Sequence, residues 1–354
     1  MSLPSDSRGP RPRATIRDVA ALAGVGIKTV SRVINHETNV SEQMRERVER
    51  AIAALNFQPN LGAGTLRRGD RKTLTLGLLL ESVGNPFSAV INRAVEEVAR
   101  SRGTAVFAAS FDDDPVRERE LVRAFTRRRV DGLILTTISA DHGYLQIERE
   151  QGTPIVFVDR PPVGLLADAV VIDNVGVARR AVQHLVEAGH RWIVHFAGNP
   201  AISTTVERRR GFDEQMIETG LDPFRYPVQA SARRHPENDV EAEVERLMNL
   251  AEPPTAIFTS QNFITISALR ALHRLGLAHR VALIGVDDLN VGDLNLGDLL
   301  DPAVTVLAQD PAAIGTLAAQ RLFARLDGDT SAEQTIVVPT ELIARGSGEI
   351  RPPS

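Results

Sequence analysis

The chain of 354 residues contains no cysteine, which excludes a disulfide framework, a thiolate metal site and cysteine catalysis together. Residues 1–14 are rich in Pro, Ser and Arg and lack the apolar core of a signal peptide. No apolar run approaches the ~20 residues that a membrane span requires. These absences predict a cytoplasmic protein that has no membrane partner.

Charge is divided unevenly along the chain. The net charge is −4, yet residues 1–72 hold 13 Lys or Arg against 7 Asp or Glu. The remaining residues hold 28 Lys or Arg against 38 Asp or Glu. A basic head on an acidic body indicates that only the head meets a polyanion. A solvated charged arm would explain the same imbalance, so charge alone leaves both interpretations open.

Three short helices are predicted in the head. The first, 15–23, begins at Thr15, whose position favours a capping box, and Gly24 ends it. The second covers 27–35, and the third follows a possible cap at Ser41. Three short helices with a tight glycine turn between the first two are typical of a helix-turn-helix unit.

The second helix of such a unit enters the major groove of DNA. Its apolar residues turn the others outward, and these are Ile27, Lys28, Ser31, Arg32 and Asn35, with Thr29 and His36 at the margins. Arg32 can bond guanine and Ile27 can contact a thymine methyl group. Thr15, Ser31 and the start of the first helix suit phosphate contacts. The alternative is that these polar residues are only the solvated side of a small helix.

Beyond a linker at 60–72, short apolar runs alternate with amphipathic stretches. The predicted strands are 74–80, 105–109, 132–136, 155–158, 192–197, 256–259 and 282–286. The predicted helices between them include 89–102, 116–128, 178–188 and 264–275. This alternation predicts parallel sheets in two α/β lobes, with a ligand cleft where the carboxyl ends of the strands meet.

The head and the body together resemble one known family. The head, ATIRDVAALAGVGIKTVSRVINHETNVSEQMRERVERAIAALNFQPN, resembles the lactose and purine repressor (LacI/GalR) family of bacterial transcription regulators nearly residue by residue. Further matches follow in order: GNPF at 84–87, VDG at 130–132, VDR at 158–160, IDN at 172–174, EAGH at 187–190, GVDD at 285–288 and TVLAQ at 305–309. The resemblance covers almost the whole chain after residue 14.

This resemblance implies a homodimer that places two heads on a near-palindromic operator of double-stranded DNA. It also implies a hinge that inserts Leu66 into the minor groove, with Asn60 and Ala63 beside it. Gly62 and Gly64 depart from the family pattern, and each lowers helix propensity by ~1 kcal/mol relative to alanine. We therefore expect this hinge to be reluctant to order.

The resemblance also implies a small-molecule effector, a sugar or sugar derivative, bound in a body like that of periplasmic sugar-binding proteins. The implied effector-binding residues are Phe87, Asp159, Arg208, Gln261, Asp287 and Gln309. The aspartates would accept hydrogen bonds from hydroxyl groups, and Arg208 would donate them. The family usually has Asn-Asp where this chain has Gln261-Asn262, which places the contact there in doubt.

The predicted organisation is a disordered arm at 1–14, a helix-turn-helix domain at 15–59, the hinge at 60–72, a two-lobed effector and dimerisation domain at 73–345, and a tail at 346–354. The tail contains no leucine heptads, so a dimer is expected rather than a tail-tethered tetramer.

Rival functions have little support in the sequence. No Walker A loop, no G-x-S-x-G elbow and no metal-ligand cluster is present, so neither an enzyme nor a cofactor is expected. The triplet 112–114 suits a helix cap better than a calcium loop. His184 and His190 have no evident acidic partner and are interpreted as structural. A sugar-binding protein without a DNA role remains the alternative.

Overall fold

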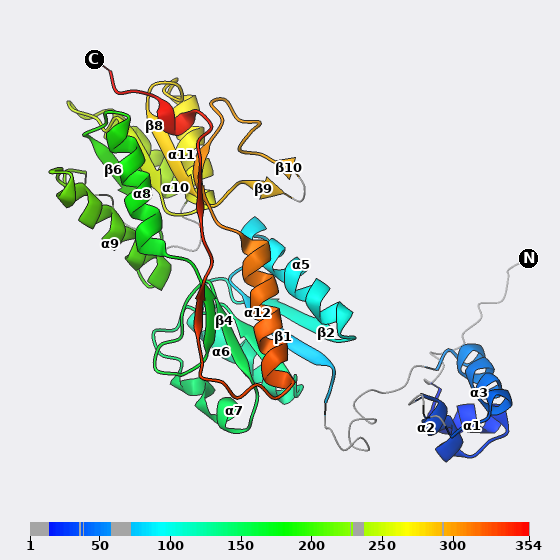
Figure 1. Cartoon of the computed structure of the whole chain (residues 1–354). Coiled ribbons are helices and arrows are strands. Elements are labelled where there is room, and N and C mark those ends of the chain that lie inside the picture. The colour runs from blue at the N-terminus through cyan, green and yellow to red at the C-terminus, as the bar shows by residue number, and fades with distance from the viewer. Residues whose placement is uncertain are drawn as a thin grey trace, which may run out of the picture. The chain divides into compact units, whose positions relative to one another are not determined.

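The computed structural model describes residues 14–34, 37, 39–57, 72–226, 228, 237–291 and 294–353. The chain divides into two compact units, 1–73 and 74–354. Figure 1 shows a small helical unit and a larger unit in which helices cover two sheets. Within the described residues, no helix is long and apolar enough to cross a membrane.

The first unit is a bundle of three helices, α1 (Ile16–Ala23), α2 (Ile27–Ile34) and α3 (Glu42–Ala54). Its core consists of Val19, Ala20, Ala23, Val30, Val33, Val48 and Ala51. Gly24 ends α1 with a φ of 62°, a left-handed conformation that glycine adopts without steric cost. The guanidinium of Arg47 donates a hydrogen bond to the carbonyl of Ala23 at 2.6 Å and so fixes α3 against the end of α1.

The N-terminal lobe of the second unit contains a six-stranded parallel sheet in the order β12-β5-β4-β3-β1-β2. The strands are β1 (Thr75–Leu80), β2 (Ala105–Ser110), β3 (Gly132–Leu135), β4 (Ile155–Val158), β5 (Asp168–Val171) and β12 (Thr335–Val337). The helices are α5 (Pro86–Ser101), α6 (Pro115–Arg127), the short α7 (Gln146–Glu150) and α12 (Pro311–Leu326), with a 3-10 turn η1 (Gly143–Leu145).

Alternation along β1 explains why both faces of this sheet are covered. Leu76, Leu78 and Leu80 pack in the cluster that includes α5 and α12. Leu79 points the other way and packs with Phe125 of α6. Figure 1 shows α5 and α12 lying against one another along this lobe.

The C-terminal lobe contains a five-stranded sheet in the order β13-β11-β8-β7-β6, in which only β13 runs antiparallel to its neighbour. The strands are β6 (Ile193–Phe196), β7 (Ala256–Thr259), β8 (Ala282–Val286), β11 (Thr305–Ala308) and β13 (Glu341–Ile343). The helices are α8 (Asn174–Glu187), α9 (Ser203–Glu218), α10 (Glu237–Met248) and α11 (Asn262–Arg274). A two-stranded ribbon, β9 (Asn290–Val291) and β10 (Leu294–Asn295), projects from this lobe, and a 3-10 turn η2 (Ser347–Glu349) follows β13.

Each predicted strand matches an observed strand to within two residues, which confirms the two-lobed α/β fold. The chain passes between the lobes at 172–173, 309–310 and 338–340. These crossings bring the carboxyl ends of β1, β4 and β8 to the region where the lobes meet, which is where a ligand cleft was expected.

The residues assigned from sequence to a tail pack into the C-terminal lobe. Ser347 is buried, and its hydroxyl donates to the carbonyl of Leu283 at 2.6 Å. His190 Nε2 lies 2.7 Å from the carbonyl oxygen of Ile350. His184 Nε2 lies 2.6 Å from Glu349 Oε1, so the interpretation of His184 as lacking an acidic partner was wrong. Packing places residues 347–350 within the body.

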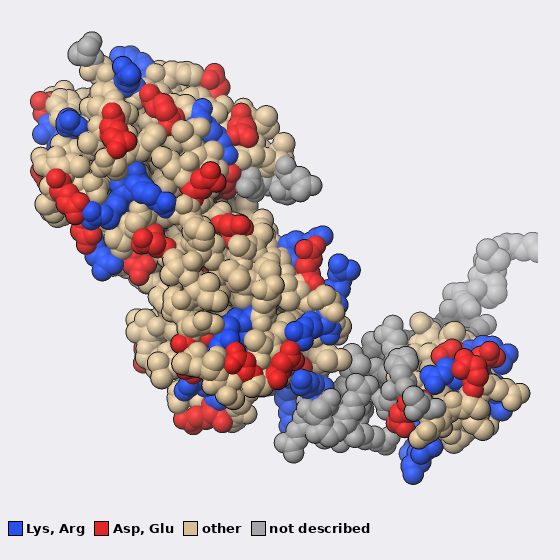
Figure 2. Space-filling model, in the orientation of Figure 1, with Lys and Arg blue, Asp and Glu red and all other residues tan. Residues whose placement is uncertain are grey.

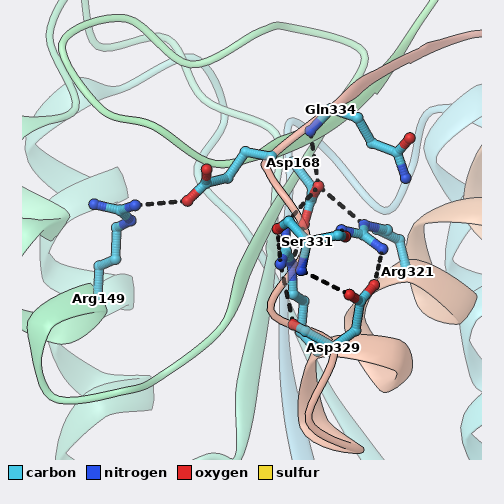
Figure 3. A network of polar contacts seen from close by, with 8 residues as sticks. Arg149, Asp168, Arg321, Asp329, Ser331 and Gln334 are labelled. Carbon is cyan, nitrogen blue, oxygen red and sulfur yellow. Dashed lines mark hydrogen bonds and ion pairs between the residues drawn. The ribbon is translucent and has the colours of Figure 1, made fainter.

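A buried carboxylate joins the end of α12 to the start of β5. Asp168 is 2% exposed, and its oxygens lie 2.9 Å from Arg321 Nε and 2.7 Å from Arg325 Nε. The backbone N–H of Gln334 donates to the same carboxylate at 3.0 Å. Figure 3 shows this network, in which Asp329 also pairs with Arg321. It ties the strand β12, reached from a distant part of the chain, to the edge of the sheet.

Candidate DNA-reading surface and effector cleft

The outer face of α2 presents the residues that the sequence predicted to face DNA. Lys28 and Arg32 are exposed, Ile27 is 40% exposed, and Thr29 and Ser31 are half-buried. The inner face buries Val30 and Val33, so the helix has one apolar and one polar side. This arrangement leaves the predicted reading residues accessible, and their contact with bases stays a prediction.

Arg32 carries a weak ion pair at the surface. Its Nε lies 3.6 Å from Glu37 Oε2, with the two side chains 46% and 49% exposed. An exposed pair of this kind contributes ~0–1 kcal/mol, so the guanidinium can exchange Glu37 for a base edge at small cost. The predicted residues Asn35, His36, Asn60, Ala63 and Leu66 lie outside the described residues.

Thr15 is exposed at the start of α1, but its hydroxyl is engaged. The Thr15 N–H and Oγ1 both donate to Asp18 Oδ2 at 2.7 Å. These two hydrogen bonds hold the pKa of Asp18 below its ordinary value. A phosphate offers only acceptors, so a contact from the Thr15 hydroxyl would require this bond to break. A contact between the Thr15 hydroxyl and a phosphate stays a prediction, and it would need the hydroxyl to leave Asp18 first.

Two aspartates stand at equivalent places in the two lobes. Asp159 directly follows β4, with a φ of 68°, and Asp287 directly follows β8, with a φ of 73°. Left-handed conformations are uncommon for residues other than glycine and cluster at functional sites. The N–H of Asp159 donates to Val170 and that of Asp287 to Leu307, so neighbouring strands hold both backbones in place.

Asp287 lies in a buried polar cluster of the C-terminal lobe. Burial raises its pKa, while the nearby Arg208, a hydrogen bond from Gln309 and the backbone N–H of Asn262 act in the opposite direction. The charge of Asp159, which belongs to the other lobe, also contributes to the raised pKa of Asp287. The structure thus brings together Asp159, Arg208, Asp287 and Gln309, and their contact with an effector stays a prediction.

Arg208 projects from α9 and is 5% exposed. Its Nε donates to Asn174 Oδ1 at 2.9 Å, and its Nη1 donates to the carbonyl of Ser260. A buried guanidinium held at two points has little freedom to move. It therefore presents its remaining N–H groups in a fixed direction.

Phe87 and Gln309 line a cavity together with Asp287. Its volume is about 640 Å³, which is within the range of small-molecule sites. Phe87 lies in the first turn of α5, where Asn85 Oδ1 accepts its N–H at 3.1 Å. Phe87 thus supplies an apolar surface to this cavity, whose lining does not include Asp159 or Arg208.

The departure at Gln261-Asn262 has a structural explanation. Gln261 begins α11, and its carbonyl accepts the N–H of Thr265. Asn262 is 2% exposed, and its Nδ2 donates to Asn85 Oδ1 of the other lobe at 2.9 Å. An aspartate has no N–H with which to make this bond. The sequence placed a doubtful effector contact here, whereas the structure shows a hydrogen bond between the lobes.

Sequence reasoning missed Arg160, which follows Asp159 in the VDR motif. Arg160 is 7% exposed, and its Nη1 donates to the carbonyl of Thr137 at 2.9 Å. Its Nε lies 3.4 Å from Asp159 Oδ2, and its Nη1 lies 3.7 Å from Asp113 Oδ1. The motif itself was the available signal, because it pairs an acidic and a basic residue at the carboxyl end of a strand.

Other residues singled out in the sequence have structural roles. Asp114 caps α6 by accepting the N–H groups of Val116 and Arg117, which confirms the predicted cap. No group of three or more His, Asp or Glu side chains suited to a metal ion occurs in the part of the chain that the structure describes.

Known proteins resemble this chain along nearly its whole length. Residues 15–60 match the model of bacterial regulatory proteins of the lacI family, and residues 182–348 match a periplasmic binding protein-like domain. The HTH-type transcriptional regulator PtxS of Pseudomonas aeruginosa is 32% identical, over 95% of this chain and 96% of that protein. The HTH-type transcriptional regulator CelR of Thermobifida fusca is 32% identical, over 96% of this chain and 99% of that protein.

Solved structures agree with these matches. A transcriptional regulator CelR–cellobiose complex is 30% identical, with a TM-score of 0.68 over 95% of this chain and 100% of that chain. The Lac repressor dimer bound to operator and an anti-inducer shares the fold at 24% identity, with a TM-score of 0.80 over 95% of this chain and 99% of that chain. Because relatives above 30% identity cover almost all of it, this chain belongs to the lacI family of bacterial regulatory proteins.

Proposed function

We propose that this chain is a DNA-binding transcription regulator of the cytoplasm. Its affinity for a near-palindromic operator is controlled by a sugar or sugar derivative. The three-helix unit would bind the operator as one half of a homodimer, because each unit presents a single reading helix and two units read two half-sites. Membership of the lacI family and the named activities of the relatives support this function.

One observation carries the effector part of the proposal. Asp159 comes from one lobe, Arg208 and Asp287 come from the other, and the two aspartates are electrostatically coupled. A polyol placed among them would donate hydroxyl hydrogens to both carboxylates and accept from the guanidinium. Such a ligand would contact both lobes and would therefore stabilise the lobe arrangement that brings these residues together.

Control of DNA binding then follows from thermodynamic linkage. An effector that prefers one lobe arrangement changes the operator affinity of the dimer to the extent that this arrangement favours or opposes DNA binding. Typical couplings of 1–3 kcal/mol correspond to about 5- to 150-fold changes in affinity. The alternative function, sugar binding without a DNA role, predicts no operator at all.

The test uses the full-length chain and fragments of its own genome. We expect a preference for a near-palindromic fragment over scrambled DNA, a change in that affinity by an added sugar, and a light-scattering mass of two chains. Asp287→Asn should abolish the sugar response and leave binding without sugar unchanged, because it removes the buried charge beside Arg208. Sugar binding without any fragment preference would favour the alternative, and a mass of four chains would contradict the dimer.

A further inference from the structure

Two carboxyl groups that the proposed function does not use stand beside the effector cleft. Glu81 directly follows β1, and Asp113 lies in the turn after β2, so both are at the carboxyl edge of the N-terminal sheet. Both are partly buried, and both interact electrostatically with Arg160 and Asp159. Glu81 also accepts a hydrogen bond from Asn85 Nδ2 at 3.2 Å, and Asn85 is the residue that contacts the other lobe.

The cleft therefore holds more acidic than basic groups. Its carboxyl groups are Glu81, Asp113, Asp159 and Asp287, and its guanidinium groups are Arg160 and Arg208. Burial raises the pKa values of Glu81 and Asp113, and the neighbouring carboxylates raise them further, while Arg160 lowers them. The four carboxyl groups thus outnumber the two guanidinium groups that lie among them.

Both guanidinium groups are already engaged by protein acceptors. Arg208 donates to Asn174 and Ser260, and Arg160 donates to Thr137 and lies between Asp113 and Asp159. An incoming carboxylate or phosphate could therefore accept only from the N–H groups that these acceptors leave over. It would also be buried beside like charges, which is costly in a site of low dielectric constant.

Hydroxyl groups suit the same site well. Arg160 Nε and Gln309 Oε1 are buried and make no hydrogen bond within the described part of the chain, although Arg160 Nε lies 3.4 Å from Asp159 Oδ2 in an ion pair. A hydroxyl group can accept from the first and donate to the second, because it is both a donor and an acceptor. Hydroxyl groups can also donate to the carboxylates of Asp159 and Asp287, which an anionic group of a ligand cannot do.

From this arrangement, which rests on the proposed function, we infer that the effector is an uncharged polyol of the neutral-sugar class. We assign to Glu81 and Asp113 the role of excluding sugar acids and sugar phosphates. Removing the charge of either residue should weaken this discrimination while leaving the contacts of the ligand hydroxyls in place.

The test is titration calorimetry of the full-length chain with matched pairs of sugars. Suitable pairs are glucose and glucuronate, galactose and galacturonate, ribose and ribose 5-phosphate, and cellobiose and cellobionate. In any pair of which one member binds, we expect the neutral sugar to bind at least ~10-fold more tightly. This is a conservative value for repulsion between two like charges within one cleft at an effective dielectric constant of ~20, before screening by salt.

Isosteric variants then separate charge from packing. Glu81→Gln and Asp113→Asn should each reduce the ratio of neutral to acidic affinity about 10-fold, with little change in the affinity of the neutral sugar. Glu97→Gln is the control, because it removes the same charge from an exposed ion pair with Arg93 on α5 and should leave the ratio unchanged. Tighter binding of an acid than of its neutral partner by the unmodified chain would overturn the inference.

The same measurements separate failure of the proposed sugar class from failure of the role assigned to Glu81 and Asp113. If no member of any pair binds while a nucleobase does, the sugar class in the proposed function fails, and the present inference fails with it. If sugars bind but the variants leave the ratio unchanged, only the role of Glu81 and Asp113 is overturned.

Discussion

Arg32 has the properties of a residue that can read a base. It is exposed on the outer face of α2, and its one ion pair, with Glu37, is weak because both partners face solvent. A bidentate contact between arginine and guanine contributes ~1–3 kcal/mol of discrimination. A contact between Arg32 and a guanine would therefore stabilise the complex by more than the loss of the ion pair with Glu37 costs.

We expect Arg32→Ala to lower the affinity for the cognate operator by ~1–3 kcal/mol and to relax the preference for one base pair. The measurement is fluorescence anisotropy with the operator and with single-base variants of it. Arg50→Ala on α3 is a control that removes the same charge from an exposed residue, and it should affect all sequences alike. Equal discrimination by the Arg32 variant and the unmodified chain would show that another residue reads the DNA.

His195 lies in an environment that disfavours the protonated form of its imidazole ring. It lies between Phe212 and Phe258, with ring centroids at 4.9 and 4.8 Å, and its Nε2 lies 2.7 Å from Ser260 Oγ. Burial, with the nearby Arg209 and Arg208, lowers its pKa to about 3. The unfolded chain binds a proton here below pH ~6.5, whereas the folded chain does not, so this residue costs stability as the pH falls from ~6.5 towards 3.

The expected cost is about 1.4 kcal/mol per pH unit in that window. His195→Gln should remove it, so the free energy of unfolding should fall less between pH 6.5 and 5 in the variant than in the unmodified chain. Urea unfolding followed by the fluorescence of Trp192, the single tryptophan of the chain, reports on this lobe because Trp192 immediately precedes β6. An identical pH slope in both proteins would show that His195 is protonated in the folded state.

At the scale of an element, β5 and β12 depend on the carboxylate of Asp168. Burial alone would raise its pKa, but hydrogen bonds from Arg325, the N–H of Gln334 and Arg321 hold it below its ordinary value. The ionised group therefore contributes stability above pH ~4, and this contribution is lost as the pH falls through the lowered pKa. Without the charge, two buried guanidinium groups lose their common partner.

We expect Asp168→Asn to destabilise the N-terminal lobe by about 2–4 kcal/mol at neutral pH, somewhat less than a fully buried pair because Asp329 still pairs with Arg321. Glu333→Gln is the matched control, since Glu333 forms a partly exposed pair with Arg149 in the same network and should change stability by less than about 1 kcal/mol. Circular dichroism during urea unfolding measures both. Equal stabilities of the two variants would contradict a central role for Asp168.

The elements also show what sequence patterns can and cannot predict. β1 and β4 were predicted because buried parallel strands are continuous apolar runs. The strands β5 and β11 were not predicted, although their residues are largely buried. The strands β12 and β13 were missed because each has three residues and is largely accessible to solvent. Their place is set by pairing with strands that are distant in the sequence, so no local pattern marks them.

The residues of the site also divide into those that a local sequence pattern marks and those that only distant contacts define. Asp159 and Asp287 were predicted as effector contacts because they occur in motifs that resemble those of the family, and Arg208 was carried over from the same resemblance by its position. Asn262 was not predicted to bridge the lobes, because its partner Asn85 is separated from it by 177 residues and comes from the other lobe. The partner of His184, Glu349, is 165 residues away and was missed for the same reason.

At the scale of the whole molecule, charges of both signs share the visible surface of the larger unit. Figure 2 shows Lys and Arg interspersed with Asp and Glu over the visible face of the larger unit. The surplus of acidic groups that matters for a ligand lies instead among partly buried residues at the cleft. Under the proposed function, recognition of the effector would depend on these partly buried charges and on how closely the lobes approach each other.

The hydrogen bond from Asn262 to Asn85 belongs to the lobe arrangement in which the cleft residues meet. Asn85 cannot turn to compensate for a lost donor, because its Oδ1 also accepts the N–H of Phe87 and its Nδ2 donates to Glu81. Loss of one such bond costs ~0.5–1.5 kcal/mol, which is a 2- to 10-fold shift in the equilibrium between lobe arrangements.

The hydrogen bond from Asn262 to Asn85 stabilises one lobe arrangement. An effector that bridges the lobes would stabilise the same arrangement. Asn262→Ala should therefore move the operator affinity of the effector-free dimer 2- to 10-fold in the direction opposite to that caused by the effector. Operator titrations with and without effector measure both shifts on one scale. If the variant binds effector more weakly but its operator affinity without effector is unchanged, Asn262 contacts the ligand and does not set the balance between the lobe arrangements.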